Sequence, residues 1–216
     1  MDPMTHALAG QMIADALPFS GRLGEKAPLV AALAAMAPDV DLLPAIVAGF
    51  PPKFAGGRLI ARDWSLARRF HRAYTHSFFF VTLASPFLGW LAWRWSGRRG
   101  HWLHWSILVL LALYSHIILD LTNFFGVRAW LPFSAGRPAW ALLPLLDPPI
   151  IAVLLGVLFL NHVFRNSYAG LEAAAIRPDT WRKRTAGRIN RLLRSEHAAW
   201  IGLGLIAARI LAAAWL

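Results

Sequence analysis

Long apolar stretches, separated by short polar and basic segments, make up most of the chain. Three of them are long enough to cross a bilayer, which takes about 20 apolar residues. A fourth closes the chain and carries one charge, Arg209, whose side chain can reach the nearby interface. The predicted spans are His76–Trp95, Leu103–Phe125, Ala139–Phe164 and Ala198–Leu216. Trp residues gather near the ends of these stretches, as in the aromatic belts of membrane proteins.

The N-terminal region has two shorter apolar stretches, Thr5–Leu17 and Ala27–Ala37, joined by the helix-breaking segment Pro18–Lys26. This pattern predicts a short helical hairpin, either re-entrant or spanning with help from its neighbours. A cleavable signal peptide is not expected, because no basic segment precedes the apolar stretch and because His6 and Asp15 interrupt it. The hairpin would return residue 38 to the level of residue 5.

The predicted fold class is therefore all-α, a polytopic membrane helical bundle with about four long transmembrane helices plus an N-terminal short helical hairpin. Composition agrees, since 57% of the 216 residues are hydrophobic and only 15% are charged. Soluble domains are about half apolar and a quarter charged. Both an ordinary soluble globule and a disordered chain are thus excluded. The absence of cysteine excludes disulfides and thiolate metal ligands.

The formal net charge is +11, and 19 of the 22 basic residues are Arg. These residues lie between the apolar stretches, which indicates contact with a lipid bilayer, and no nucleic-acid-binding motif accompanies them. Twelve basic residues lie on the side of the Pro18–Lys26 turn and eight on the opposite side. The positive-inside rule therefore favours an orientation with the Pro18–Lys26 turn in the cytoplasm and the opposite side, which carries Pro51–Thr75, outside it.

A basic segment, Arg165–His197, precedes the last apolar stretch. It contains a candidate amphipathic helix, Trp181–Arg194, which would lie on the membrane surface; a solvated charged loop is the alternative. A protein partner could bind through residues 165–197.

Ionisable residues inside apolar stretches cost about 2.5–3.5 kcal/mol for an Asp at mid-membrane, and by default they mark function. His116 and Asp120 are four residues apart and so share one helix face, together with Asn123. A neutral imidazole and a carboxylate one turn apart can bind a metal ion together. A buried His–Asp hydrogen bond between helices is the structural alternative.

Asp39 and Asp41 follow Pro38, which disfavours helix at the preceding residue, so we expect a turn at the membrane surface. Two close carboxylates repel unless a cation or a proton lies between them. A solvated turn at the end of a helix is the alternative.

His71 and His76 are five residues apart, so they would face different sides of a regular helix but could converge on a turn. Arg72, between them, could bind an oxyanion or a phosphate oxygen. A basic interfacial segment with incidental His residues is the alternative.

His6 near the start of the hairpin and Asp147 before the third long span complete the set. Each also has a structural interpretation, an interfacial residue for His6 and a helix N-cap for Asp147. The predicted topology, however, brings all of these groups to one membrane face. The predicted metal ligands are His6, Asp39, Asp41, His71, His76, His116, Asp120 and Asp147. Residues 1–164 would form a membrane-embedded metal-site domain, and residues 165–216 a basic interfacial segment and a final transmembrane helix.

Four motifs occur in order along residues 1–150: Met-Thr-His-Ala-Leu-Ala-Gly, Pro-Asp-Val-Asp, His-Arg-Ala-Tyr-Thr-His-Ser, and a block from His116 that includes His-Ile-Ile-Leu-Asp-Leu-Thr-Asn. In these motifs the chain resembles the YdjM-like family of inner-membrane proteins, described as metal-dependent hydrolases. The resemblance implies a metal site at the matching His and Asp residues. Ala73 stands where Gly is commoner, and Asn123 where Ser is commoner. Some members are described as LexA-binding, which implies a regulatory alternative.

Mixed His and Asp ligands without Cys favour Zn²⁺, as one or two ions, with Mn²⁺ or Fe²⁺ as alternatives. We therefore expect an integral-membrane hydrolase acting on an ester or phosphoester of a lipid-like, anionic substrate. Asp41 or Asp39 would be the general base, and Arg72, with Arg128, would neutralise the substrate. The alternatives are an intramembrane ion or proton transporter and a non-catalytic membrane anchor for a protein partner.

Overall fold

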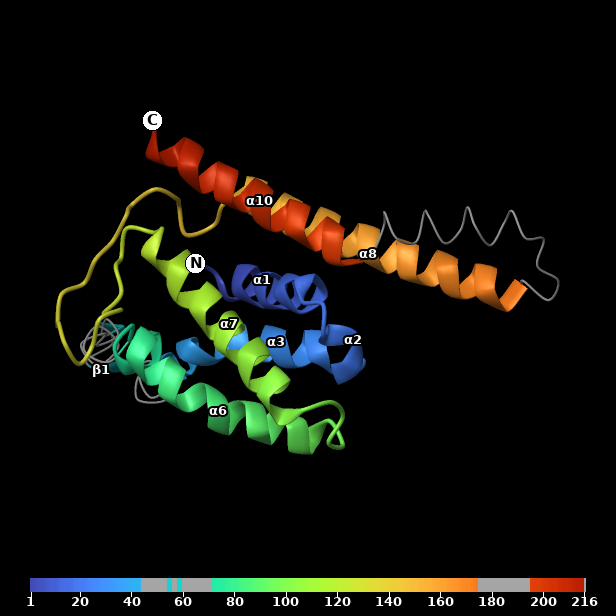
Figure 1. The fold of residues 1–216 in the computed structure, drawn as a ribbon. Helices are drawn as coiled ribbons and strands as arrows, with labels where there is room; N and C mark the ends of the chain where they lie inside the picture. The colour runs from blue at the N-terminus through green and yellow to red at the C-terminus, as the bar shows by residue number, and fades with distance from the viewer. Residues whose placement is uncertain (44–53, 56–57, 60–70, 175–194, 216) are drawn as a thin grey trace.

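A computed structural model describes residues 1–43, 54–55, 58–59, 71–174 and 195–215 (Figure 1). These residues form a helical fold, as predicted, with one small antiparallel ribbon that pairs Phe54 with Leu59 and Ala55 with Arg58. The elements in chain order are α1 (Pro3–Ala16), α2 (Ser20–Leu23), α3 (Ala27–Met36), the 3-10 helix η1 (Ala37–Leu42), β1 (Phe54–Ala55), β2 (Arg58–Leu59), the 3-10 helix η2 (Tyr74–His76), α6 (Phe78–Trp95), α7 (Trp102–Leu121), α8 (Pro148–Ala174) and α10 (Ser195–Ala214).

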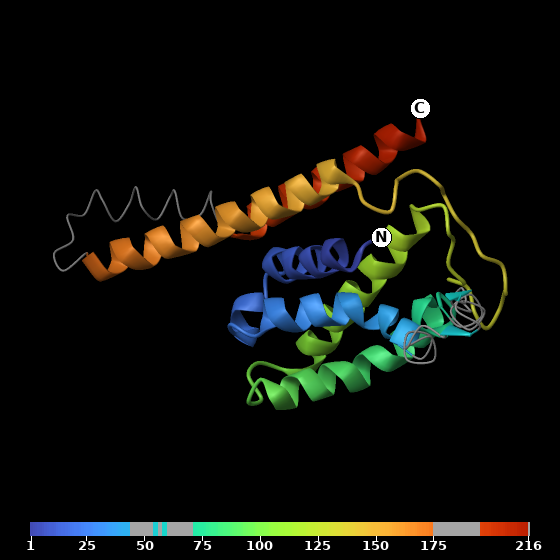
Figure 2. The same ribbon diagram turned by 180° about the vertical axis from the view of Figure 1, so that it is seen from behind.

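The predicted N-terminal hairpin is present as α1 and α3, which lie side by side in Figures 1 and 2. Asp2 caps α1 by accepting a hydrogen bond from the Thr5 backbone N–H at 2.9 Å. Helices of 14 and 10 residues extend about 21 and 15 Å, so neither crosses the roughly 30 Å hydrocarbon core. The two helices touch at Gly10, where an added Cβ would overlap the carbonyl oxygen of Ala31 and lie 2.7 Å from the Cβ of Ala35.

A first apolar core joins this hairpin to α6 and α7. Trp105, Leu108 and Ile117 of α7 are fully buried and pack with the small residues of α3, such as Ala31. At the α6–α7 crossing, Gly89 lies against the backbone of Ser106, which leaves no room for a side chain. This close packing of small residues is typical of helices in membranes.

The C-terminal helices form a second layer. In both ribbon views α8 and α10 run side by side, on the side of the molecule that holds α1 (Figure 2). Ile150 and Leu154 of α8 and Ile206 of α10 pack with Met12 of α1 in a second core. The predicted amphipathic helix Trp181–Arg194 lies outside the described residues.

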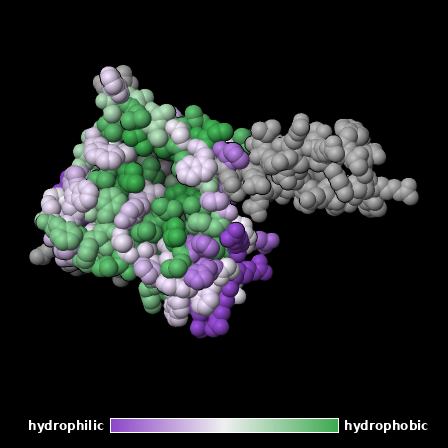
Figure 3. Space-filling view, in the orientation of Figure 1, coloured by the Kyte–Doolittle hydropathy of each residue, from purple (hydrophilic) through white to green (hydrophobic). Residues whose placement is uncertain are grey.

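Membrane insertion is supported by surface chemistry. Large apolar side chains such as Leu83, Phe87, Phe159 and Leu211 are each more than 60% exposed, and Figure 3 shows apolar residues spread over the visible face. Hydrophilic residues gather at one end, where Figure 1 places α2 and the turn between α6 and α7. Exposed apolar surface on this scale needs lipid or protein to cover it.

Among the described residues, two helices are long and apolar enough to cross a bilayer, Trp102–Leu121 and His197–Ala214. The expected four long spans are therefore not confirmed. Helix α6 lies where a span was predicted, and α7 ends four residues early, at Leu121. The prediction of a span from Ala139 was wrong, because α8 begins only at Pro148. Prolines at 144, 148 and 149 disfavour helix in the residues that precede them.

Candidate metal centre

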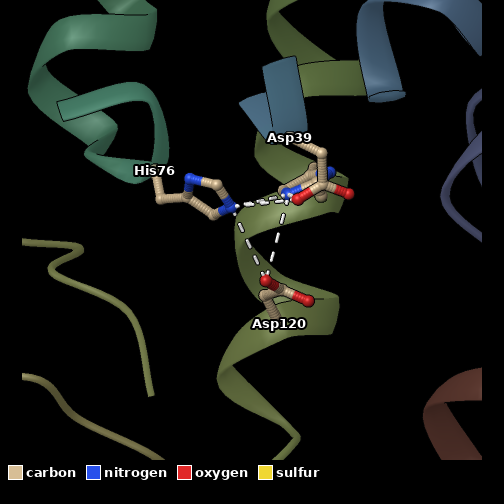
Figure 4. A group of neighbouring side chains, drawn as sticks. Asp39, His76 and Asp120 are labelled. Atoms are coloured by element: carbon tan, nitrogen blue, oxygen red, sulfur yellow. Dashed lines mark hydrogen bonds and ion pairs between the residues drawn. The ribbon is translucent and has the colours of Figure 1, made fainter. Parts of the chain in front are cut away.

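Three elements that are distant in sequence bring four ionisable side chains to one buried cluster (Figure 4). Asp39 comes from η1, His76 from the end of η2, and His116 and Asp120 from the C-terminal part of α7. The side chains of His76, His116 and Asp120 are fully buried, and that of Asp39 is 20% exposed. We call these four residues the cluster. The structure thus brings the segments around Asp39, His76 and His116 together at one place.

The separations within the cluster match the edges of a metal coordination tetrahedron. The Nε2 atoms of His76 and His116 are 3.0 Å apart. Asp39 Oδ1 is 3.6 Å from each of these nitrogens. Asp120 Oδ2 is 3.6 Å from His76 Nε2 and 3.9 Å from His116 Nε2. Tetrahedral Zn²⁺ with ligands at 2.0–2.1 Å places neighbouring ligand atoms about 3.3 Å apart.

Hydrogen bonds on the outer side of both imidazoles determine which nitrogen faces the cluster. His116 Nδ1 lies 2.6 Å from the carbonyl oxygen of Ala35, which can only accept, so Nδ1 carries the proton. This carbonyl belongs to the last turn of α3, where helix geometry leaves carbonyls without a partner. His76 Nδ1 faces Thr75 Oγ1 at 3.0 Å and Asp41 Oδ2 at 3.4 Å. Both Nε2 lone pairs therefore point at each other, which is unfavourable unless a cation lies between them.

Asp41 lies behind His76, on the Nδ1 side of its ring and away from the cluster. Its Oδ1 accepts a hydrogen bond from His71 Nδ1 at 2.6 Å. Its Oδ2 accepts from Thr75 Oγ1 at 2.6 Å and from the Arg72 backbone N–H at 3.1 Å. Burial opposes ionisation of Asp41, but the hydrogen bonds from His71, His76 and Thr75 outweigh it and hold the pKa of this carboxyl well below its usual range. Asp41 with His71 and His76 could also hold an ion, but both of its oxygens already have donors.

The two carboxylates nearest His76 make the cluster favourable for positive charge. Burial alone would lower the pKa of His76, but Asp39 and Asp41 raise it above 6.5. Burial likewise opposes ionisation of Asp39, yet the neighbouring His76 and His116 lower the pKa of Asp39 below 3.8. The two carboxylates thus favour a bound positive charge at this position, either a proton on His76 or a metal ion.

Arg72 lies inside the site and not on its rim. Its side chain is 8% exposed, and one guanidinium nitrogen is 3.1 Å from Asp120 Oδ2. Arg72 Nη1 also donates to Asn123 Oδ1 at 3.0 Å, and Asn123 Nδ2 donates to Asp120 Oδ1 at 3.2 Å. The backbone of Arg72 has φ 62°, a conformation that non-glycine residues rarely adopt. The structure therefore assigns Arg72 to Asp120, whereas the sequence had suggested a substrate-facing role.

His6 adjoins the cluster from α1. Its ring stacks on His116 with centroids 3.8 Å apart, and its Nε2 is 3.3 Å from Asp120 Oδ1. The ring is fully buried, and neither nitrogen makes a hydrogen bond to the described residues. The amino group of Met1 contacts the same Asp120 oxygen. His6 is thus beside the predicted ligands, with a nitrogen available to Asp120 or to an ion.

The structure separates Asp147 from these residues. Asp147 Oδ1 accepts from the Ile150 backbone N–H at 3.0 Å, which caps α8. Asp147 Oδ2 is 2.9 Å from Arg209 of α10. Neither candidate metal group among the described residues includes it. The N-cap alternative is therefore the one that the structure favours.

Sequence reasoning missed four contributors: the Ala35 carbonyl, Thr75, the Arg137 side chain and the backbone of Arg128. Arg137 donates to the His71 carbonyl oxygen at 3.0 Å, and the Arg128 N–H donates to that of Arg72 at 3.0 Å. Thr75 could have been found from its position beside His76, but a backbone carbonyl leaves no sequence signal.

These features define a helical membrane protein with a buried His–Asp cluster suited to a divalent metal ion. The chain belongs to the YdjM inner membrane protein family, which matches residues 1–212. It is an inner-membrane protein, in agreement with the two apolar helices. Comparison with curated proteins and with solved structures found no match.

Proposed function

We propose that this protein is an integral-membrane metal-dependent hydrolase that acts on an ester or phosphoester of a lipid-like, anionic substrate. One observation carries the proposal. Two fully buried imidazoles place their Nε2 atoms 3.0 Å apart, between two carboxylates, so four potential ligand atoms surround one position. Imidazole nitrogens and carboxylate oxygens are ligand atoms that Zn²⁺ uses in proteins.

The donor set fits a metal ion. Two imidazole nitrogens and two carboxylate oxygens suit Zn²⁺ first, with Mn²⁺ or Fe²⁺ as alternatives. His76, His116, Asp39 and Asp120 would hold one ion, with His6 able to complete the shell or to contribute to a second position. When bound, such an ion polarises ester and phosphoryl oxygens and lowers the pKa of water.

The surrounding residues keep this arrangement in place. The Ala35 carbonyl and Asp41 orient the two imidazoles, as outer-shell groups do in metalloenzymes. Arg72 balances the charge of Asp120, which is fully buried.

His71 is better placed than Asp41 to transfer protons. Its side chain is 21% exposed and its Nδ1 is engaged by Asp41, so its Nε2 can accept a proton from water or substrate. Asp41, with both oxygens engaged, would orient His71 and stabilise its charged form, as the acid of a catalytic triad does.

Two loop arginines supply positive charge beside the cluster. Arg128 and Arg137 are tied to the backbone of Arg72 and His71 through the two hydrogen bonds described above. Burial lowers the pKa of Arg137, and the positive charges of Arg128 and Arg72 lower it further. An anionic headgroup would relieve this repulsion.

Metal content and hydrolysis test the proposal together. Detergent-purified protein would be analysed by elemental mass spectrometry, then assayed with and without added Zn²⁺ or Mn²⁺ on phosphatidic acid and on p-nitrophenyl acyl esters. His116→Ala should lose both metal and activity, while the surface variant Leu83→Ala should keep both. Stoichiometric metal with no hydrolysis of any substrate would overturn the enzyme assignment and favour transport or anchoring. No metal after reconstitution would overturn the site itself.

A further inference from the structure

An apolar groove opens beside the cluster. It lies between η1, η2, α6 and α7 and has a volume of about 330 Å³. Its walls are almost entirely apolar, and Thr75 supplies a hydroxyl group at one end. The volume is at the lower end of the range for small-molecule sites.

Three residues that line the groove lie close in sequence to the predicted metal ligands. Pro38 directly precedes Asp39, and Thr75 directly precedes His76 and donates to Asp41. Leu113 lies one turn before His116 on the same face of α7. The groove therefore lies next to the segments that carry the cluster, although no cluster residue lines it.

The groove continues along α6. Val81, Ala84 and Leu88 form a stripe at helical spacing, which extends about 10 Å at 1.5 Å per residue. The outward-facing neighbours Leu83 and Phe87 are 62% and 61% exposed, so the groove opens on a surface that the bilayer covers. A chain could enter it sideways from the membrane.

We propose that this groove binds the acyl chain of the substrate, with the scissile ester or phosphoester at the cluster and the anionic group near Arg128 and Arg137. The inference rests on the proposed function and adds a substrate class, an anionic amphiphile with an extended alkyl chain. The two chemistries are separated, because Arg137 donates to the His71 carbonyl oxygen whereas the groove is lined almost entirely by apolar residues.

Blocking the groove tests this assignment. Ala84 is exposed, so Ala84→Trp can fill the groove without disturbing the core, and Leu83→Trp places the same side chain outside it. Hydrolysis of p-nitrophenyl dodecanoate and of p-nitrophenyl acetate would be compared in metal-loaded protein. Ala84→Trp should lower kcat/KM for the dodecanoate by about one order of magnitude, the effect of losing two buried methylene groups. The ratio of the dodecanoate rate to the acetate rate should therefore fall for Ala84→Trp, whereas Leu83→Trp should leave this ratio and the metal content unchanged.

A binding measurement separates this inference from the hydrolase assignment. Dodecyl phosphate with a diazirine at the chain end would be photo-crosslinked to wild-type protein and both variants. Labelling of residues 80–88 that dodecyl phosphate competes away, and that Ala84→Trp removes, supports the groove even if no ester is hydrolysed. Labelling unaffected by Ala84→Trp, equal loss in Leu83→Trp, or equal loss of acetate and dodecanoate hydrolysis would overturn it even in an active enzyme.

Discussion

Asp120 and Asp147 both lie in apolar stretches and were both predicted as metal ligands, but the structure places them in different environments. Both are almost completely buried, and both have an Arg nitrogen within 3.1 Å. Asp120 also faces the Nε2 atoms of His76 and His116, so its surroundings include potential ligand atoms for a cation. Asp147 faces the N-terminus of α8 and Arg209, so its charge is already balanced. The partners of a buried carboxylate, more than its burial, distinguish a metal ligand from a structural anchor.

The same contrast extends to the two parts of the molecule. The layer of α1, α3, α6 and α7 encloses the cluster, and its helices touch through Gly10 and Gly89 at backbone contacts. The α8–α10 layer rests on α1 through apolar side chains and a hydrogen bond from Asn161 to Asp15, and the Arg209–Asp147 ion pair lies within this layer. We therefore expect metal binding to depend on the first layer and to tolerate changes in the second.

The largest expected effect is the loss of metal on substitution of Asp120. Asp120→Asn removes a ligand charge, so affinity should fall by more than the roughly 10–100-fold that the loss of an outer-shell partner costs. Asp147→Asn is the matched control, because Asn caps a helix as well as Asp does and no cluster residue is altered. Zn²⁺ affinity of the purified variants measures both, and equal losses would contradict the distinction between the two aspartates.

Much of the site could be predicted from the sequence because each motif is short and local. The i,i+4 pair His116 and Asp120 needs only a helix, and the hairpin that returns Asp39 to His6 needs only two apolar stretches and a turn. The left-handed residue at Arg72 and the turn after it bring His71 and His76 together, with ring centroids 5.5 Å apart.

What the sequence could not predict depends on long-range partners. Asp147 pairs with Arg209, 62 residues away, and nothing in either segment indicates that pairing. The helix-like apolarity of residues 139–147 concealed a proline-controlled extended segment, because hydrophobicity does not report backbone hydrogen bonding. Arg72 carries the residue type of a substrate anchor, and only its position shows that it balances Asp120.

A smaller loss of metal affinity is expected on substitution of Asp41, the carboxylate behind His76. Asp41→Asn keeps the size of the side chain but replaces an acceptor facing His76 and His71 with a weaker one. Metal affinity should fall by about 10–100-fold, less than for Asp120→Asn. Isothermal titration with Zn²⁺ checks the order. If Asp41→Asn matched Asp120→Asn, Asp41 would be a ligand itself and two metal positions would become the better description.

One added methyl group should destabilise the layer of α1, α3, α6 and α7 more than the α8–α10 layer. Gly10→Ala collides with the backbone of Ala31, so we expect a loss of about 1–3 kcal/mol in stability and lower metal occupancy. Gly202→Ala meets the side-chain ends of Met12 and Val157 at 2.8 Å, which can shift, and it gains helix propensity. Thermal unfolding in detergent with metal analysis compares them. Equal destabilisation would mean that both layers are packed to the same tolerance.

The smallest expected effect on the metal comes from the α8–α10 ion pair. Arg209→Gln leaves the buried Asp147 charge without its cation, so the unfolding midpoint should fall while Zn²⁺ affinity stays within experimental error. Adding Asp147→Asn removes that charge, so the double variant should be more stable than Arg209→Gln alone. The coupling energy expected for such contacting residues is about 0.5–3 kcal/mol. Strictly additive effects on the unfolding midpoint would show that the ion pair contributes nothing. A change in Zn²⁺ affinity would show that the α8–α10 layer supports the cluster.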